Sequence, residues 1–272
     1  MLGLQTLDLM WLWLAAAAVV SGLLAYVGAM VGLVLGQFRL PLLLVALGSA
    51  PAAAASNLAI SSLGAGTGAF THAREGRVEL RLLLSIGLPS AVAAYVTSRS
   101  IDRIDGWWIE VLIGATLLVS AVPIARRARS TGSAGEGQPG DQSAAPKPEP
   151  RSNGLLLAEV LIGTILGALS GVVGLLLGTM RLPAMLRLGV SAPKAAGTNM
   201  AIGFFTGVAG ALGALQEQRV SIEAFVLVGG ATLIGAWLGA KRTKSLPSSG
   251  HFALIAIVLA VVGVWLVVSA LI

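Results

Sequence analysis

The chain carries the stretch GQFRLPLLL at residues 36–44 and a second version of it, GTMRLPAML, at residues 178–186. Both stretches lie in strongly apolar sequence, where an arginine followed by leucine and proline is unusual. Proline removes a backbone N–H donor and clashes with the preceding turn, so a helix breaks or kinks beside it. The repeated Arg-Leu-Pro therefore predicts two broken or re-entrant helices, at Pro41 and at Pro183.

The composition around these stretches is typical of a membrane protein. Of the 272 residues, 56% are hydrophobic and 11% are charged, and the mean hydropathy is +0.88. Apolar runs long enough to cross a bilayer recur, and they do not alternate with polar residues as β-barrel strands do. We therefore expect an all-α polytopic protein in the prokaryotic plasma membrane. We assign the net charge of +6 to loop residues that orient the spans, and not to nucleic-acid binding.

The two halves of the chain are copies of each other. A shift of 142 positions, which takes Pro41 to Pro183, aligns them without a gap over about 70 residues. The stretch SAPAAAASNLAI at 49–60 then meets SAPKAAGTNMAI at 191–202. We expect about four to five membrane segments in each half. The predicted units are a first membrane repeat at 1–125, a disordered cytoplasmic linker at 126–153 and a second membrane repeat at 154–272.

The loop charges indicate that the second repeat is inverted relative to the first. The loop after the third apolar run is basic in the first half, with Arg74, Arg77 and Arg81, whereas its copy has only Arg219. The following loop is clearly basic only in the second half, at 241–245. Because cytoplasmic loops carry the excess of Lys and Arg, both basic loops face the cytoplasm only if the repeats have opposite orientations.

Three motifs follow one another in each half. A Gly-rich span leads into x-Pro-x-Leu at 28–44, then come AAAASNL with its copy AAGTNM, and then the basic loop HAREGRVELR. In this order the motifs resemble those of the TauE/SafE sulfite exporter family, also called the toluene-sulfonate uptake permeases, over nearly the whole chain outside the linker. The resemblance implies a secondary transporter for sulfite, thiosulfate or an organosulfonate that works by alternating access at the interface of two repeats. The stretch GLVLGQF replaces the adjacent glycines of many relatives, so the substrate stays open.

Arg39 and Arg181 are the first candidates for holding an anion. A charged side chain at the centre of a membrane helix costs about 2.5–3.5 kcal/mol on insertion scales, so two of them at equivalent positions indicate a use. A guanidinium is a planar fork of donors that suits an oxyanion, and a helix that restarts beside it adds backbone N–H groups. Two alternatives are open: the arginines snorkel to lipid headgroups at the interface, or they cap backbone carbonyls.

The Ser-Ala-Pro motif places further candidates in the small-residue helices. Pro51 and Pro193 are expected in the first helical turn, where they mark further helix breaks. A carboxamide in an apolar span needs a partner, which is either the substrate or a neighbouring helix. The candidate substrate-binding residues therefore include Asn57, Asn199, Ser56 and Thr198. Small residues four positions apart predict close helix packing at Gly32, Gly36, Gly174 and Gly178.

Other kinds of chemistry find little support in the sequence. The chain has no cysteine and two histidines, and its spans carry no acidic pair, metal-ligand cluster or Walker motif. We therefore expect no enzyme, no metal and no cofactor, and as partners a small sulfur-containing anion and the lipid bilayer. A passive anion channel and a structural or partner-binding membrane protein are the alternative functions. Coupled protons, the direction of transport and the oligomeric state are left open.

Overall fold

The computed structural model describes residues 2–31, 34–133 and 153–240 and a few residues between 260 and 268. Within these ranges the regular structure is helical and no strand occurs, which confirms the all-α prediction. Five of the described helical segments are long and apolar enough to cross a membrane: Leu9–Ala29, Leu80–Arg99, Gly154–Val173, Pro193–Gln216 and Ile222–Gly239. The chain is therefore a multi-pass membrane protein.

The helices of the two halves correspond. The first half contains α1 (Leu2–Val31), η1 (Gly36–Phe38), α2 (Leu40–Leu47), α3 (Ala50–Arg74), α4 (Leu80–Leu82), the π-helical η2 (Leu83–Gly87), α5 (Leu88–Arg99), η3 (Ile101–Arg103) and α6 (Gly106–Ser133). The second half contains α7 (Asn153–Val173), α8 (Gly178–Arg187), α9 (Ala192–Gln216) and α10 (Ile222–Ala240). When 142 is added to the residue numbers of the first half, α1 aligns with α7, α2 with α8, α3 with α9 and α5 with α10.

Local sequence sets the starts of the two central helices. Ser49 is the N-cap of α3, and its hydroxyl accepts a hydrogen bond from the N–H of Ala52 (3.4 Å). Ser191 occupies the same position before α9, although its side chain makes no capping bond. Pro51 and Pro193 both lie in the first turn, where a missing N–H leaves no hydrogen bond unmade.

The breaks that precede the two Arg-Leu-Pro stretches differ in their relation to the proline. Pro41 lies in the first turn of α2, so this helix restarts next to the proline. In the second half, residues 174–177 are non-helical, and Pro183 lies inside α8. The prediction of a helix break at Pro183 is therefore wrong. Gly174, which directly follows α7, has a φ of +74° that residues with a Cβ rarely adopt, and it turns the chain there.

Helix α6 extends into the segment that the sequence analysis assigned to the linker. It continues to Ser133, beyond the predicted boundary at residue 126. The Ala and Arg residues that begin this segment are good helix formers, which favours this extension. The rest of the predicted linker, from 134 to 152, lies outside the described residues, as do Gly32 and the basic loop at 241–245.

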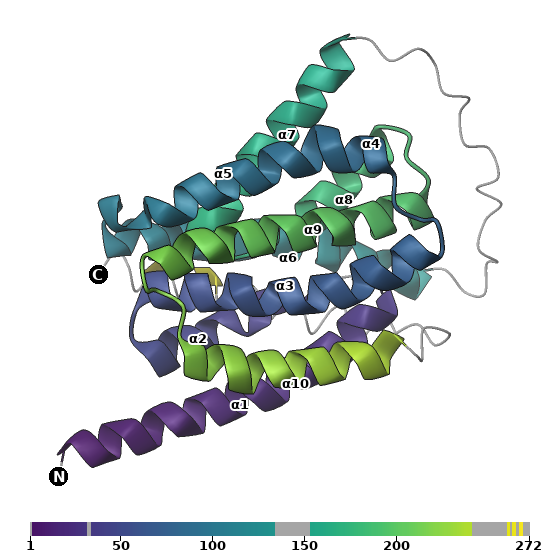
Figure 1. Ribbon diagram of the computed structural model, residues 1–272. Coiled ribbons are helices and arrows are strands. Elements are labelled where there is room, and N and C mark those ends of the chain that lie inside the picture. The colour runs from purple at the N-terminus through teal and green to yellow at the C-terminus, as the bar shows by residue number, and fades with distance from the viewer. Residues whose placement is uncertain are drawn as a thin grey trace.

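Helices α3 and α9 lie side by side in the middle of the bundle and run in opposite directions (Figure 1). Two equivalent hydrogen bonds tie the ends of these helices together. The N–H of Ser221, after α9, donates to the hydroxyl of Ser56 near the start of α3 (2.9 Å). The N–H of Glu79, after α3, donates to the hydroxyl of Thr198 near the start of α9 (2.9 Å). A shift of 142 positions converts one bond into the other.

The first helix of each half packs against the last helix of the other half. Helix α1 lies along α10, where Gly239 faces the carbonyl of Tyr26. Helix α7 lies along α5, where Gly167 faces the carbonyl of Ser90. Backbones approach this closely only where a residue has no side chain, which explains the glycines at these contacts.

The two ends of the bundle differ in charge. One end, which we call the mouth end, contains the C-terminus of α3 and the N-terminus of α9, and α10 ends there at Ala240. The basic residues at this end include Arg74, Arg77, Arg81 and Lys194. At the opposite end, the far end, Arg99 at the end of α5 pairs with Glu217 after α9 (3.4 Å). By the positive-inside rule, this distribution predicts that the mouth end faces the cytoplasm.

Candidate functional site

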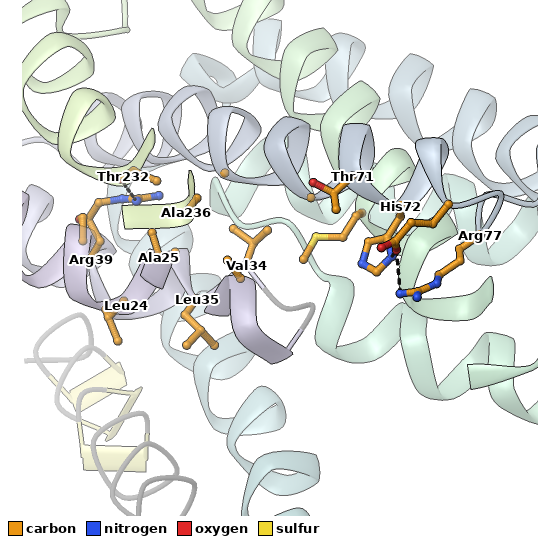
Figure 2. A pocket seen from close by; sticks show the side chains of 17 residues that line it. Leu24, Ala25, Val34, Leu35, Arg39, Thr71, His72, Arg77, Thr232 and Ala236 are labelled. Carbon is orange, nitrogen blue, oxygen red and sulfur yellow. Dashed lines mark hydrogen bonds and ion pairs between the residues drawn. The ribbon is translucent and has the colours of Figure 1, made fainter. Parts of the chain in front are cut away.

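A cavity of about 280 Å³ leads from the mouth end to Arg39 inside the bundle (Figure 2). Arg39 and Thr232 lie at its inner end, and His72 and Arg77 lie at its outer end, with Val34 between them. The rest of the wall is mostly apolar and comes from α1, α3, α9 and α10. The cavity therefore connects a buried cation with a charged loop at the membrane surface.

Neutral oxygen atoms hold the guanidinium of Arg39, which is only 3% exposed. Its Nε donates to Oδ1 of Asn57 (2.8 Å), and Nη1 donates to Oγ1 of Thr232 (3.2 Å). Its Nη2 donates to Oγ of Ser61 (2.7 Å) and to the carbonyl oxygen of Asn57 (3.3 Å). A guanidinium has five N–H groups. Four hydrogen bonds therefore leave one N–H of Nη1 available to a ligand in the cavity.

No carboxylate among the described residues pairs with Arg39. The ion pairs among the described residues lie at the ends of the bundle, and none of them includes this side chain. Taking a charge out of water is costly unless an opposite charge compensates for it. A buried cation that has only neutral partners, at the inner end of a cavity, therefore favours an anion from solution.

Asn57 orients Arg39. Besides accepting the Nε bond, the fully buried Asn57 amide donates from Nδ2 to the carbonyl oxygen of Gly174 (2.7 Å). Gly174 is the residue at the break of the second half, so one amide connects the arginine of one half to the helix break of the other. Asn57 does not line the cavity, which gives it a positioning role.

Sequence reasoning missed two of the side chains that hold Arg39. Ser61 lies one helical turn after Asn57 on the same face of α3, so the spacing of four residues contains a signal for it. Thr232 has no such signal, because it lies 193 positions from Arg39 in the chain. Only the packing of α10 against α3 brings it to the site.

The predicted glycines make room for these contacts. A Cβ on Gly36 would overlap the hydroxyl of Ser61 and would lie 2.9 Å from Nη2 of Arg39. A Cβ on Gly174 would overlap backbone atoms of a neighbouring helix, and one on Gly178 would lie 2.7 Å from the side chain of Asn199. These distances are too short for a side chain, so each glycine permits a close approach.

The equivalent arginine, Arg181, is closed off from this cavity. It is fully buried, and among the described residues its Nη2 donates a hydrogen bond to Oγ of Ser90 (3.5 Å). Its Nε and Nη1 have no partner among the described residues, and neither has Oδ1 of the nearly buried Asn199. A cavity of about 10 Å³ lies beside Asn199, and this is about the volume that one water molecule requires.

The structure therefore separates the predicted site residues. Both arginines are buried, which does not fit side chains that snorkel to the membrane surface. Of the predicted substrate-binding residues, Arg39 alone lines the larger cavity. The hydroxyls of Ser56 and Thr198 hold backbone N–H groups at the helix ends. No group of three or more side chains suited to a metal ion occurs in the part of the chain that the structure describes.

A multi-pass bundle of helices with a cavity that ends at a buried cation is the architecture of a membrane transporter. Comparison with known proteins identifies its family. The family model described as Sulfite exporter TauE/SafE matches residues 14–266, and the chain belongs to this family. The chain is 26% identical to a Bacillus subtilis (strain 168) protein named Probable membrane transporter protein YdhB over 199 aligned residues. The aligned region covers 71% of this chain and 73% of the relative. No solved structure matches the chain.

Proposed function

We propose that this protein is a secondary transporter of a small sulfur-containing anion, such as sulfite, thiosulfate or an organosulfonate. Arg39 holds the anion at the inner end of the cavity. The observation that carries the proposal is a buried guanidinium at the end of a cavity that reaches the surface, with one N–H unused and no acidic partner among the described residues. Membership of the TauE/SafE family supports a sulfur-containing substrate.

The proposed mechanism is alternating access between two inverted repeats. The opposite directions of α3 and α9 and the equivalent hydrogen bonds at their ends support the inversion. The cavity is open at the mouth end. At the far end, Tyr95 donates to Gln216 (2.9 Å), Arg99 pairs with Glu217 and Arg219 donates to the carbonyl of Arg99 (3.2 Å). A site that is open at one end and closed at the other is one state of an alternating-access cycle.

The alternative functions explain these features less well. A passive channel needs a path that is continuous through the membrane when it conducts, and the described cavity reaches only one end. A purely structural protein has no need for an uncompensated cation beside a cavity. We propose no catalytic role, because the charged side chains at the cavity mouth are already paired: Arg77 contacts Glu75 at 2.8 Å.

Flux of radiolabelled sulfite into proteoliposomes tests the proposal. Arg39→Ala removes all four hydrogen bonds and the charge, and we expect at least a tenfold loss of flux, which corresponds to about 1.4 kcal/mol. Arg39→Lys keeps the charge but loses the fork of donors, so we expect an intermediate flux. Arg181→Ala is the matched control, because Arg181 is equally buried but does not line the cavity.

Two results would contradict the proposal. Full flux in Arg39→Ala would place the anion elsewhere. A wild-type protein that carries none of sulfite, thiosulfate and a panel of organosulfonates would refute the sulfur-anion substrate class. The thermal unfolding temperature of each variant, measured in the same detergent, distinguishes a lost site from a lost fold.

A further inference from the structure

The two halves have corresponding helices, yet Arg39 lines the cavity of about 280 Å³, whereas Arg181 lines neither this cavity nor the small one beside Asn199 in the part of the chain that the structure describes. The difference begins with the helix that precedes each break. In α1, Ser21, Ala25 and Ala29 are three of the residues that line the cavity. Their equivalents in α7 are Gly163, Gly167 and Gly171, and a Cβ on each of these glycines would overlap atoms of η2 or α5. Helix α7 therefore lies directly on its neighbour, whereas the corresponding face of α1 borders an open space.

The central helices differ at one equivalent position that faces this space. Gly64 of α3 lines the cavity, and a Cβ on it would lie 3.5 Å from Cγ2 of Thr232. A side chain at position 64 would therefore point toward Thr232, which is a hydrogen-bond partner of Arg39. With glycine at this position, the space in front of the guanidinium stays empty.

Thr206 is the equivalent residue of α9, and its side chain fills the corresponding space. It is fully buried, and its hydroxyl donates to Oγ of Ser90 (2.9 Å). Ser90 is the counterpart of Thr232, and it is also the residue that Arg181 contacts. The threonine thus occupies the position next to Arg181 that Gly64 leaves open next to Arg39.

We propose that Gly64 is the residue that admits the anion to Arg39, and that Thr206 excludes it from Arg181. The protein then has one anion-binding site and not two. The arginine of the second half, Arg181, positions α8 against α5. This inference rests on the proposed function and specifies which half of the protein carries it. Gly64 contacts no substrate. It is a positioning residue, because its missing side chain leaves the cavity in front of Arg39 open.

Thiol labelling measures this access without any knowledge of the substrate. The chain has no cysteine, so Ala25→Cys supplies a single thiol near the inner end of the cavity, where Figure 2 shows Ala25 close to Arg39. The probes are two methanethiosulfonate reagents of similar size, one with a sulfonate group and one with a trimethylammonium group. We expect both to modify the thiol, and the anionic sulfonate reagent to react several times faster because Arg39 attracts it.

The decisive variants exchange the two equivalent residues. In the Ala25→Cys background, Gly64→Thr should lower the rate of modification at least tenfold, and Gly64→Ala should lower it less. Gly64→Ala keeps the test valid if Gly64→Thr does not fold, because the added Cβ would make only an ordinary van der Waals contact at 3.5 Å. Thr206→Gly is the matched control and should leave the rate unchanged, because Thr206 does not line this cavity.

Sulfite flux in the same variants separates this inference from the proposed function. We expect Gly64→Thr to lose at least tenfold in flux and Thr206→Gly to retain it. Wild-type labelling and flux in Gly64→Thr would overturn the role of Gly64, while the transport function would stand. Equal rates of modification by the two reagents would overturn the assignment of the anion-binding site to Arg39. A third outcome is that the labelling rates of the variants change as expected but the protein transports no sulfur-containing anion. This outcome would support the role of Gly64 in access to the cavity and refute the proposed substrate.

Discussion

The amide of Asn57 offers the sharpest test of how the site is built. It accepts a hydrogen bond from Nε of Arg39 (2.8 Å) and donates one to the carbonyl oxygen of Gly174 (2.7 Å). Asn57→Ala removes these two bonds, so the Nε of Arg39 and the carbonyl oxygen of Gly174 stay buried without them, while Arg39 keeps its bonds to Ser61, Thr232 and the backbone of residue 57. Asn199→Ala is the matched control, because Asn199 is the equivalent residue and is nearly as buried, but its Oδ1 has no hydrogen-bond partner among the described residues.

The expected loss of stability follows from the two bonds. A bond to a charged group contributes about 1.5–3 kcal/mol. A side-chain hydrogen bond inside a membrane protein contributes about 0.6 kcal/mol on average. Asn57→Ala should therefore lower the free energy of unfolding by about 2–4 kcal/mol more than Asn199→Ala does. Both substitutions remove the same atoms from a packed helix, so the difference between them isolates the hydrogen bonds.

Thermal unfolding in detergent, followed by circular dichroism, measures this difference. In a chain of this size each kcal/mol changes the melting temperature by about 2–4 °C, so Asn57→Ala should melt on the order of 10 °C below Asn199→Ala. Sulfite flux should fall with it, because Arg39 loses the group that orients it. Equal melting temperatures in the two variants would refute the reasoning, since the bond that Oδ1 of Asn57 accepts from Arg39 would then contribute nothing that Asn199 lacks.

Further predictions concern packing, symmetry and orientation. Gly36→Ala would place a Cβ 2.9 Å from Nη2 of Arg39, and we expect a loss of about 1–3 kcal/mol in unfolding free energy together with reduced flux, both measured on the purified variant. Ser56→Ala and Thr198→Ala each remove the acceptor of one of the two equivalent bonds, so we expect losses of about 0.5–1.5 kcal/mol that agree with each other in thermal unfolding; a loss in only one of them would argue against equivalent repeats. Arg81→Cys should react with a membrane-impermeant thiol reagent in inside-out vesicles and not in intact cells, and the reverse pattern would invert the assigned orientation.

The sequence predicted those features of the fold that short-range chemistry controls. Proline in the first turn and serine at the N-cap act within a few residues, and Ser49, Pro51 and Pro41 accordingly lie at helix starts. Pro183 does not follow this rule, because the break before α8 occurs earlier, next to the left-handed Gly174. The same limit applies to the linker, where helix propensity carries α6 beyond the predicted boundary to Ser133.

The membership of the candidate site was less predictable. The sequence drew attention to Arg39 and Asn57 through their repeated motifs, and the structure brings these two side chains into contact. It treated Arg181 and Asn199 as their equals, although the structure gives them no bond to each other. Thr232 joins the site from the other half of the chain, and no local spacing indicates this contact.

The sequence by itself determined that the chain is a helical membrane protein with two matching halves, because hydrophobicity and repetition are properties of the chain alone. Only the tertiary structure decided that Arg39 lines the cavity of about 280 Å³ and that Arg181 lies outside it. A cavity is the volume that packed side chains leave empty, and here it depends on how Gly64 and Thr206 meet helices from the opposite half. Motifs that match so closely therefore lie in different surroundings, because the other half contributes Thr232 beside Arg39 and Ser90 beside Arg181.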